Sequence, residues 1–119
     1  MGYYTSYQLC VLEGGDESEL INEFRKESDG AAYAIDEDGD TNESCKWYDS
    51  NQDLINFSKK HPDAIFCLEG EGEESGDVWK LYVKDGHYQE CRATMVFPEF
   101  DKAKLLADIR DSKIDKIIQ

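Results

Sequence analysis

The chain holds few of the residues on which catalytic and metal sites usually depend. It has only two histidines, His61 and His87, and neither lies in a motif with a nucleophile. Its four cysteines are at least 22 residues apart, a spacing that excludes CxxC zinc and redox motifs. Without a placed histidine, a serine or cysteine nucleophile has no evident base to activate it. We therefore predict a protein that is not an enzyme and carries no metal ion or cofactor.

Long apolar runs and export signals are missing as well. No segment is apolar enough over its length to span a bilayer, so no membrane partner is expected. The first residues lead directly into an alternating strand pattern and not into a signal peptide. We therefore expect a cytoplasmic protein with reduced, mostly buried thiols, since disulfides form in oxidising compartments.

Basic residues are scarce in two windows that hold most of the acids. Residues 13–43 contain twelve acids and two bases, and residues 69–77 contain five acids and no base. The windows carry net charges of −10 and −5 in a chain whose total is −14. Such a surface disfavours nucleic acid and anionic membranes as direct partners. It favours cationic proteins, metal ions or plain solvation.

The hydrophobic pattern predicts one α+β domain over residues 1–119, long enough for a folded core. Four runs alternate as strands do: residues 3–12, 64–71, 78–84 and 88–97. Three runs have helical spacing: residues 16–28, 49–60 and 101–118. Residues 31–35 fit either a last helical turn or a short strand. This order favours a ferredoxin-like fold, with a mostly antiparallel sheet, helices packed on one face and a C-terminal helix.

The end of the chain has two clear signals. Asp85-Gly86 is the strongest hairpin motif, and the strand that follows it continues to Phe97, where Pro98 stops it. The last helix has an apolar side of six residues: Leu105, Leu106, Ile109, Ile114, Ile117 and Ile118. It either packs across the domain or forms the surface of a homodimer.

Residues 45–86 resemble a known family. The matching pieces are Lys46-Trp47, a helix ending in Phe57-Ser58-Lys59-Lys60, the break at His61-Pro62-Asp63, the glycine-and-glutamate strand and the Asp85-Gly86 turn. The stretch resembles the ferredoxin-like domain called the YubB type, and also small uncharacterised proteins of phages and mobile elements. The resemblance implies a fold and a phage or plasmid origin, and it implies no catalytic residue.

The segment Glu69-Gly70-Glu71-Gly72-Glu73 would line up three carboxylates on one face of a strand, roughly 7 Å apart. As a solvated edge, such a row would discourage edge-to-edge pairing, which is the interpretation we favour. It could also dock on a basic protein groove in place of phosphates. A metal site is less favoured, because its carboxylates would have to converge on one ion. The glycines opposite either admit a close neighbour or mark a bulge.

The other acidic motif is the loop of residues 36–44. Its aspartates resemble the start of a calcium loop, but Thr41 replaces the required glycine and Trp47 replaces the required glutamate. A solvated acidic loop is therefore favoured. Trp79 is expected in the core, whereas Trp47 is open between the core and an interface, where tryptophan often anchors a partner.

We predict from these patterns a small acidic protein-binding module, encoded by a phage or mobile element. It would bind and inhibit a basic host protein of nucleic-acid handling or defence, by mimicking the charge of nucleic acid. The expected contact residues are Glu69, Glu71, Glu73, Glu74, Asp77, Asp36, Glu37, Asp38, Asp40 and Trp47. The alternatives are a metal-dependent hydrolase that uses the carboxylate row and a module that sequesters a small ligand or nucleotide.

Overall fold

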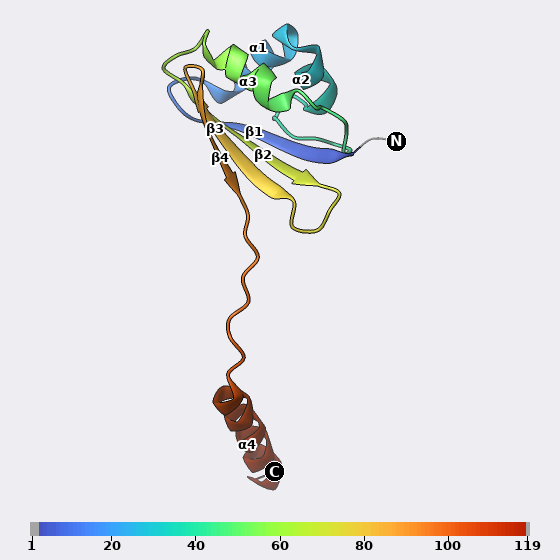
Figure 1. Cartoon of the computed structure of the whole chain (residues 1–119), viewed down its shortest axis with the longest axis vertical. Coiled ribbons are helices and arrows are strands. Elements are labelled where there is room, and N and C mark those ends of the chain that lie inside the picture. The colour runs from blue at the N-terminus through green and yellow to red at the C-terminus, as the bar shows by residue number, and fades with distance from the viewer. Residues whose placement is uncertain (1–2, 119) are drawn as a thin grey trace.

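The computed structural model describes residues 3–118, with side-chain surroundings for residues 3–111. The elements in this part of the chain follow one another as shown in Figure 1: β1 Thr5–Glu13, α1 Glu17–Glu27, α2 Asp29–Ala34, α3 Ser50–Ser58, β2 Ile65–Gly72, β3 Val78–Lys84, β4 His87–Arg92 and α4 Lys102–Ile118. The predicted α+β class and its mostly antiparallel sheet are confirmed. Below, residues 3–92 are called the head and residues 93–118 the arm.

The strands form one antiparallel sheet in the order β1-β2-β3-β4. Leu9 of β1 pairs with Leu68 of β2, which pairs with Leu81 of β3. These three side chains form a buried row across the sheet. β2 and β3 are therefore the central strands, and β1 and β4 are the edges.

Local caps divide the helical layer into short pieces. The Asp16 side chain accepts a hydrogen bond from the Glu19 N–H at 2.9 Å, which fixes the start of α1. Ser28 ends α1 and also caps α2, since its Oγ accepts a hydrogen bond from the Ala31 N–H at 3.1 Å. Residues 31–35 are thus resolved as the end of a helix and not as a strand.

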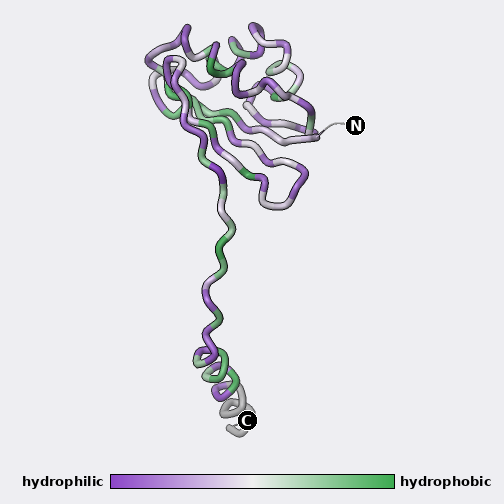
Figure 2. The backbone as a smooth tube through the Cα atoms, viewed as in Figure 1, coloured by the Kyte–Doolittle hydropathy of each residue, from purple (hydrophilic) through white to green (hydrophobic). Residues whose placement is uncertain are grey.

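Helices α1, α2 and α3 cover one face of the sheet and leave the other face open (Figure 1). Phe24 of α1 and Phe57 of α3 stack with ring centroids 4.8 Å apart, and Phe57 meets Phe66 of β2 at 5.7 Å. The hydrophobic effect of burying these rings and the inward residues of the strands holds the two layers together. Figure 2 shows apolar segments along the strands and again along the arm.

The outer edge of β1 is covered by the loop that follows α2. The Leu9 N–H donates to the Gly39 carbonyl at 2.8 Å. Thr5 and Cys45 exchange two backbone hydrogen bonds, of 2.8 and 2.9 Å. The loop therefore satisfies the outward backbone groups of β1 and closes this edge to other strands.

β4 forms the opposite edge, and all six of its residues are exposed. It follows β3 through the predicted Asp85-Gly86 turn, in which both residues have positive φ, 47° and 79°. Positive φ at both central positions is the geometry of a type I′ hairpin turn, which matches the twist of the flanking strands.

The prediction that the last strand continues to Phe97 is wrong. β3 begins at Val78, whose carbonyl accepts a final hydrogen bond from the Ala93 N–H at 2.8 Å. Beyond this point β3 offers no strand to pair with, so β4 ends at Arg92. The residues that follow run as an extended segment to α4.

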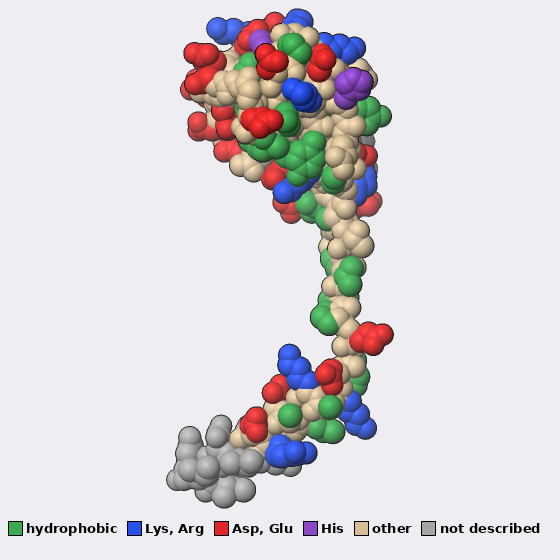
Figure 3. All heavy atoms as spheres, turned by 90° about the vertical axis from the view of Figure 1, so that its left-hand side faces the viewer, with side chains coloured by type: hydrophobic (Ala, Val, Ile, Leu, Met, Phe, Trp, Pro, Cys, Tyr) green, Lys and Arg blue, Asp and Glu red, His purple; other side chains and the backbone are tan. Residues whose placement is uncertain are grey.

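α4 begins as predicted, with the Asp101 carboxylate accepting a hydrogen bond from the Lys104 N–H at 3.1 Å. The helix stands away from the sheet, so packing across the domain is not found (Figure 1). The molecule measures 68 Å along its longest axis and 37 and 26 Å along the others. Figure 3 shows acidic side chains gathered on the head and hydrophobic ones along the segment that leads to α4. Among the described helices, none combines the length and apolar character needed to cross a bilayer.

Candidate functional site

The open face of the sheet displays part of the acidic row that the sequence predicts. Glu69 and Glu71 lie on β2, and strand alternation turns them away from the helices because Leu68 and Gly70 face the core. Glu71 is exposed and takes part in no ion pair among the residues described. Two of the three alternating carboxylates are thus presented on the open face.

The other carboxylate of the row is drawn away from it. Glu73 lies past the end of β2, and its Oε1 accepts a hydrogen bond from the Tyr4 N–H at 2.7 Å. Glu69 is partly neutralised, because its Oε1 lies 3.3 Å from the Lys80 Nζ and raises the pKa of that lysine. The predicted ridge of three free carboxylates is therefore reduced to a shorter patch.

The two glycines of the row leave space that neighbouring side chains of the head occupy. A Cβ on Gly70 would clash with the Trp79 ring, and a Cβ on Gly72 would clash with Tyr3 and Asp77. The pairing of β2 with β3 runs through this segment without a shift in register, which excludes a bulge there. The glycines therefore have a packing role on the inner face, while the glutamates project from the outer face.

The interpretation of this row as a solvated edge is wrong, because β2 is a central strand. It pairs with β1 on one side and with β3 on the other. Charges on the open face of a central strand cannot guard an edge. What remains is a solvated face or a face that contacts a partner.

One carboxylate from the second acidic window lies beside the first. Asp40 forms an isolated antiparallel bridge with Gln8 of β1, and Gln8 pairs on its other side with Glu69. Residues paired in this way lie side by side on the same face of a sheet. Asp40, Gln8 and Glu69 therefore form one row, with Glu71 two residues further along β2.

The other acids of this loop serve the loop itself or project into solvent. Asp36 Oδ1 accepts hydrogen bonds from the N–H groups of Asp38 and Asp40, at 2.9 and 3.0 Å. The Glu37 and Asp38 side chains are exposed at the tip. Within the described residues, no three His, Cys, Asp or Glu side chains are grouped so that they could hold a metal ion.

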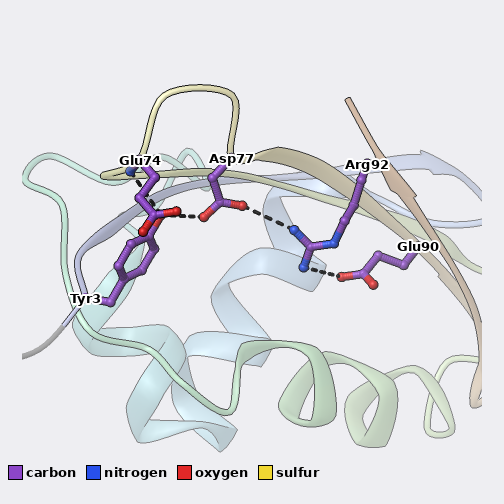
Figure 4. A network of polar contacts seen from close by, with 5 residues as sticks. All are labelled: Tyr3, Glu74, Asp77, Glu90 and Arg92. Carbon is purple, nitrogen blue, oxygen red and sulfur yellow. Dashed lines mark hydrogen bonds and ion pairs between the residues drawn. The ribbon is translucent and has the colours of Figure 1, made fainter. Parts of the chain in front are cut away.

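Asp77 belongs to a polar network at the end of the sheet (Figure 4). The Tyr3 hydroxyl donates to Asp77 Oδ2 at 2.6 Å, and this bond raises the pKa of Tyr3. Arg92 lies 3.2 Å from Asp77 Oδ1 and 3.4 Å from Glu90 Oε1. The Glu74 N–H donates to the Tyr3 hydroxyl at 3.0 Å, while the Glu74 side chain is exposed. Asp77 is thus occupied inside the head, tying the N-terminal segment and the β2–β3 turn to β4.

Trp47 is a core residue, so its prediction as a partner-binding residue is wrong. Its side chain is 3% exposed. The ring packs edge-on against Tyr7 at 5.2 Å and against Phe24 at 5.8 Å, and Nε1 donates to Asp53 at 2.8 Å. Trp79 is also buried, as predicted.

The cysteines lie in different surroundings. Cys45 and Cys67 are buried, as predicted, and burial raises the pKa of Cys67 to about 11. Cys10 is half-buried and pairs with Cys67 across β1 and β2. Cys91 is exposed on β4, contrary to the expectation that thiols in strand-like runs are buried.

Helices α1, α2 and α3 surround a hollow of about 390 Å³ whose lining includes Phe24 and Phe57. Three of its four charged lining groups, Glu27, Asp53 and Lys60, already have partners in the head. Lys60 Nζ lies 3.0 Å from Glu27 Oε2, and Asp53 Oδ2 accepts the Trp47 Nε1–H. The hollow therefore offers a small ligand little that is not already engaged.

The sequence does not show how much apolar surface the arm exposes. Four side chains of the extended segment are 68 to 82% exposed: Met95, Val96, Phe97 and Phe100. Three more on α4 are 44 to 49% exposed: Leu105, Leu106 and Ile109. The length of β3 could have indicated the exposure of the extended segment, because β3 is too short to pair with a strand that continues to Phe97. Contiguous apolar exposure of this kind marks an interaction surface.

Comparison with models of protein families, with curated proteins and with solved structures finds no match for this chain. The resemblance of residues 45–86 to the YubB-type domain stays a prediction. Function must therefore be argued from the geometry of the head and the arm.

Proposed function

We propose that the head is a protein-binding module whose open, acidic sheet face contacts a basic surface of another protein. The observation that carries this proposal is the meeting of Asp40, Glu69 and Glu71, from two distant sequence windows, on the face that the helices leave uncovered. We name these three residues the acidic patch. Edge protection does not explain the patch, and no metal-like grouping uses it among the described residues.

The charge of the head supports a cationic partner. Residues 1–92 contain 22 acids and eight bases, whereas residues 93–118 contain five of each. The excess negative charge thus belongs to the head, where it attracts and orients a basic protein during encounter. Proteins that handle nucleic acid carry such basic surfaces. Inhibition of a host protein of this kind, by a phage or mobile-element product that takes the place of nucleic acid, is the form of the function that we propose.

The ferredoxin-like arrangement remains our prediction for the fold family. The four-stranded antiparallel sheet with helices on one face supports it. The connectivity is less typical, because all three helices that cover the sheet lie in the single connection between β1 and β2. Fold analogy of this kind does not indicate a reaction or a ligand.

The test is capture of partners from a host lysate by the full chain, at low and at high salt. We expect one basic protein to bind at low salt and to be released at high salt. The double variant Asp40→Lys/Glu71→Lys should lose it, because two favourable charges of the acidic patch become repulsive. Neither side chain is needed for an ion pair or a core contact of the head.

The matched control is Glu19→Lys/Asp63→Lys, which changes the net charge equally at exposed positions away from the patch. Capture by the control and not by the patch variant supports the proposal. Equal loss from both variants would show that only net charge matters, and undiminished capture by both would show that neither pair of charges is needed. Either result would remove the acidic patch as the contact surface.

A further inference from the structure

β4 presents a row of outward backbone groups that have no partner among the described residues of the chain. Hydrogen-bonding direction alternates from residue to residue along an antiparallel strand. The Ala93 N–H bonds to β3, so the backbone groups of Cys91 point to β3 as well. Those of Tyr88, Glu90 and Arg92 therefore point away from the sheet. Within the described residues, no other strand or loop pairs with this edge.

This edge also lacks two of the devices that usually keep strands from pairing, a proline and a β-bulge. Residues 87–97 contain no proline, and the pairing of β3 with β4 has no bulge. The other edge of the sheet, β1, is covered by backbone hydrogen bonds from its neighbouring loop. An edge strand that has no bulge and is exposed and uncovered is a template for another strand.

We propose that β4 pairs antiparallel with β4 of a second copy of this chain, about a two-fold axis at Cys91, so that two sheets join into one. In this register Glu90 lies opposite the partner's Arg92, and Arg92 lies opposite the partner's Glu90. Outward backbone groups meet outward backbone groups at both pairs, as an antiparallel ladder requires. Opposite charges directly across a ladder stabilise it.

Other two-fold registers of this edge are less favourable. An axis at Glu90 places two carboxylates opposite each other, and an axis at Arg92 does the same with two guanidinium groups. An axis at Gln89 leaves both charges opposite uncharged residues. Since Arg92 already lies 3.4 Å from Glu90 in the same chain, the axis at Cys91 assembles a ring of four alternating charges.

In the same register, the partner's β4 provides a strand with which the first residues of the arm can pair. It places Ala93 opposite the partner's Gln89 and Met95 opposite the partner's His87. The alternating sequence that predicts a strand up to Phe97 would then be extended by pairing with the second copy and not within its own sheet. The exposed Met95 side chain is 68% accessible in the single chain and would gain neighbours on the partner's sheet.

Charge makes this association distinguishable from the proposed partner binding. Two heads with excess negative charge repel each other, so the dimer should strengthen as salt is added. Binding of a basic protein by the acidic patch should weaken under the same change. The inference does not rest on the proposed function, and either one can fail alone.

The first test measures the mass of the full chain by sedimentation at increasing concentration, at low and at high salt. A dimer that is more populated at high salt is expected. Glu90→Pro removes an outward N–H while leaving the bonds between β4 and β3 in place, and it should weaken the dimer at least tenfold. Circular dichroism confirms that the variant head stays folded. A monomer under all conditions, or a dimer that survives Glu90→Pro, would overturn the proposal.

The register is tested by cross-linking with diamide, which accepts two electrons and two protons as two thiols join. Cys91 and the partner's Cys91 form a non-hydrogen-bonded pair, with Cα atoms about 4.5 Å apart, within disulfide range. The full chain should therefore form a disulfide dimer that Cys91→Ala abolishes.

The matched control moves the thiol by two residues. In the Cys91→Ala background, Gln89→Cys lies about 13 Å along the strand from its own copy, beyond disulfide reach. It should not cross-link until Ala93→Cys is added, which places a thiol opposite it. Cross-linking by Gln89→Cys alone would exclude the axis at Cys91.

The charge pairing is tested by reversal and rescue. Glu90→Arg places like charges opposite each other and should weaken the dimer. The double swap Glu90→Arg/Arg92→Glu restores opposite charges and should recover it. A double swap that is as weak as the single variant would contradict the pairing of Glu90 with the partner's Arg92.

Discussion

The two edges of the sheet are treated in opposite ways by the same chain. The edge at β1 is closed, because the loop before α3 donates to and accepts from its outward backbone groups. The edge at β4 is open, and its side chains are exposed on both faces. Both edge strands pair with a central strand along most of their length, so the difference lies in what the neighbouring segments do. An edge covered by its own chain needs no partner, whereas an uncovered one has its backbone groups available for another strand.

The largest expected difference between the edges is in stability. Leu9 of β1 is 1% exposed, and Leu9→Ala should lower the free energy of unfolding by about 2–5 kcal/mol, because it leaves a cavity in the core. Tyr88 of β4 is 64% exposed, and Tyr88→Ala should change it by about 0.5 kcal/mol or less. Urea denaturation at low protein concentration measures both. Equal losses would mean that β4 is covered in solution under those conditions.

A smaller effect is expected where the loop closes the β1 edge. Gly39 has φ +84°, and a Cβ there would clash with the Leu9 carbonyl. Gly39→Ala should therefore cost more than the roughly 1–2 kcal/mol of a left-handed alanine, and hydrogen exchange at the Leu9 amide should accelerate. Gly76→Ala is the control, because Gly76 has φ +85° with open space around it. If the two variants lose the same stability, the loop does not hold this edge.

The predictions that depend on local sequence agree with the structure, whereas those that depend on which segments lie side by side do not. The start of the first helix near residue 16, the Asp85-Gly86 turn and the alternation of β3 depend on residues close in sequence, and all three are confirmed. That β2 is central depends on which strands pair, and a period of two residues looks the same in a central strand and in an edge strand. The sequence therefore predicted that the Glu69 and Glu71 side chains share one face of a strand, but not that this strand is central in the sheet.

The predictions of Trp47 as a contact residue and of a strand up to Phe97 were wrong for a related reason. Whether an aromatic side chain is buried depends on what the rest of the chain places over it, and α1 and β1 place Phe24 and Tyr7 over Trp47. No residue in the described part of the chain covers Phe97, whose side chain is 82% exposed. In neither case does the local sequence show which segment covers the side chain, so only the tertiary structure decides its burial.

The thiols of a central strand and of the open edge should respond differently to pH. Burial raises the pKa of Cys67 from 9.0 to about 11. Below pH 9 the thiol is protonated in both states. Between these two values the unfolded chain loses the proton and the folded chain keeps it, so stability should fall as the pH rises. Burial also raises the pKa of Tyr7, which adds to the fall.

Thermal melts across this pH range test the assignment to Cys67. Cys67→Ala should reduce the slope of stability against pH, and Cys91→Ala should leave it unchanged, because Cys91 is exposed at the open edge. A slope that Cys67→Ala does not alter would assign the whole effect to other groups.

The smallest expected effect on the single chain concerns Arg92, at the end of the open edge. Its ion pairs with Asp77 and Glu90 are largely solvent-exposed, so Arg92→Ala should lower the stability of the monomer by about 0–1 kcal/mol. The same variant should weaken the β4 dimer far more, since it removes both cross-strand charge pairs at once. Denaturation of the dilute monomer and sedimentation of the concentrated protein measure the two effects separately. Equal, small effects in both would mean that Arg92 acts only within the head. A large effect on the dimer alone would mean that the ion pairs seen in one chain position Arg92 for a second.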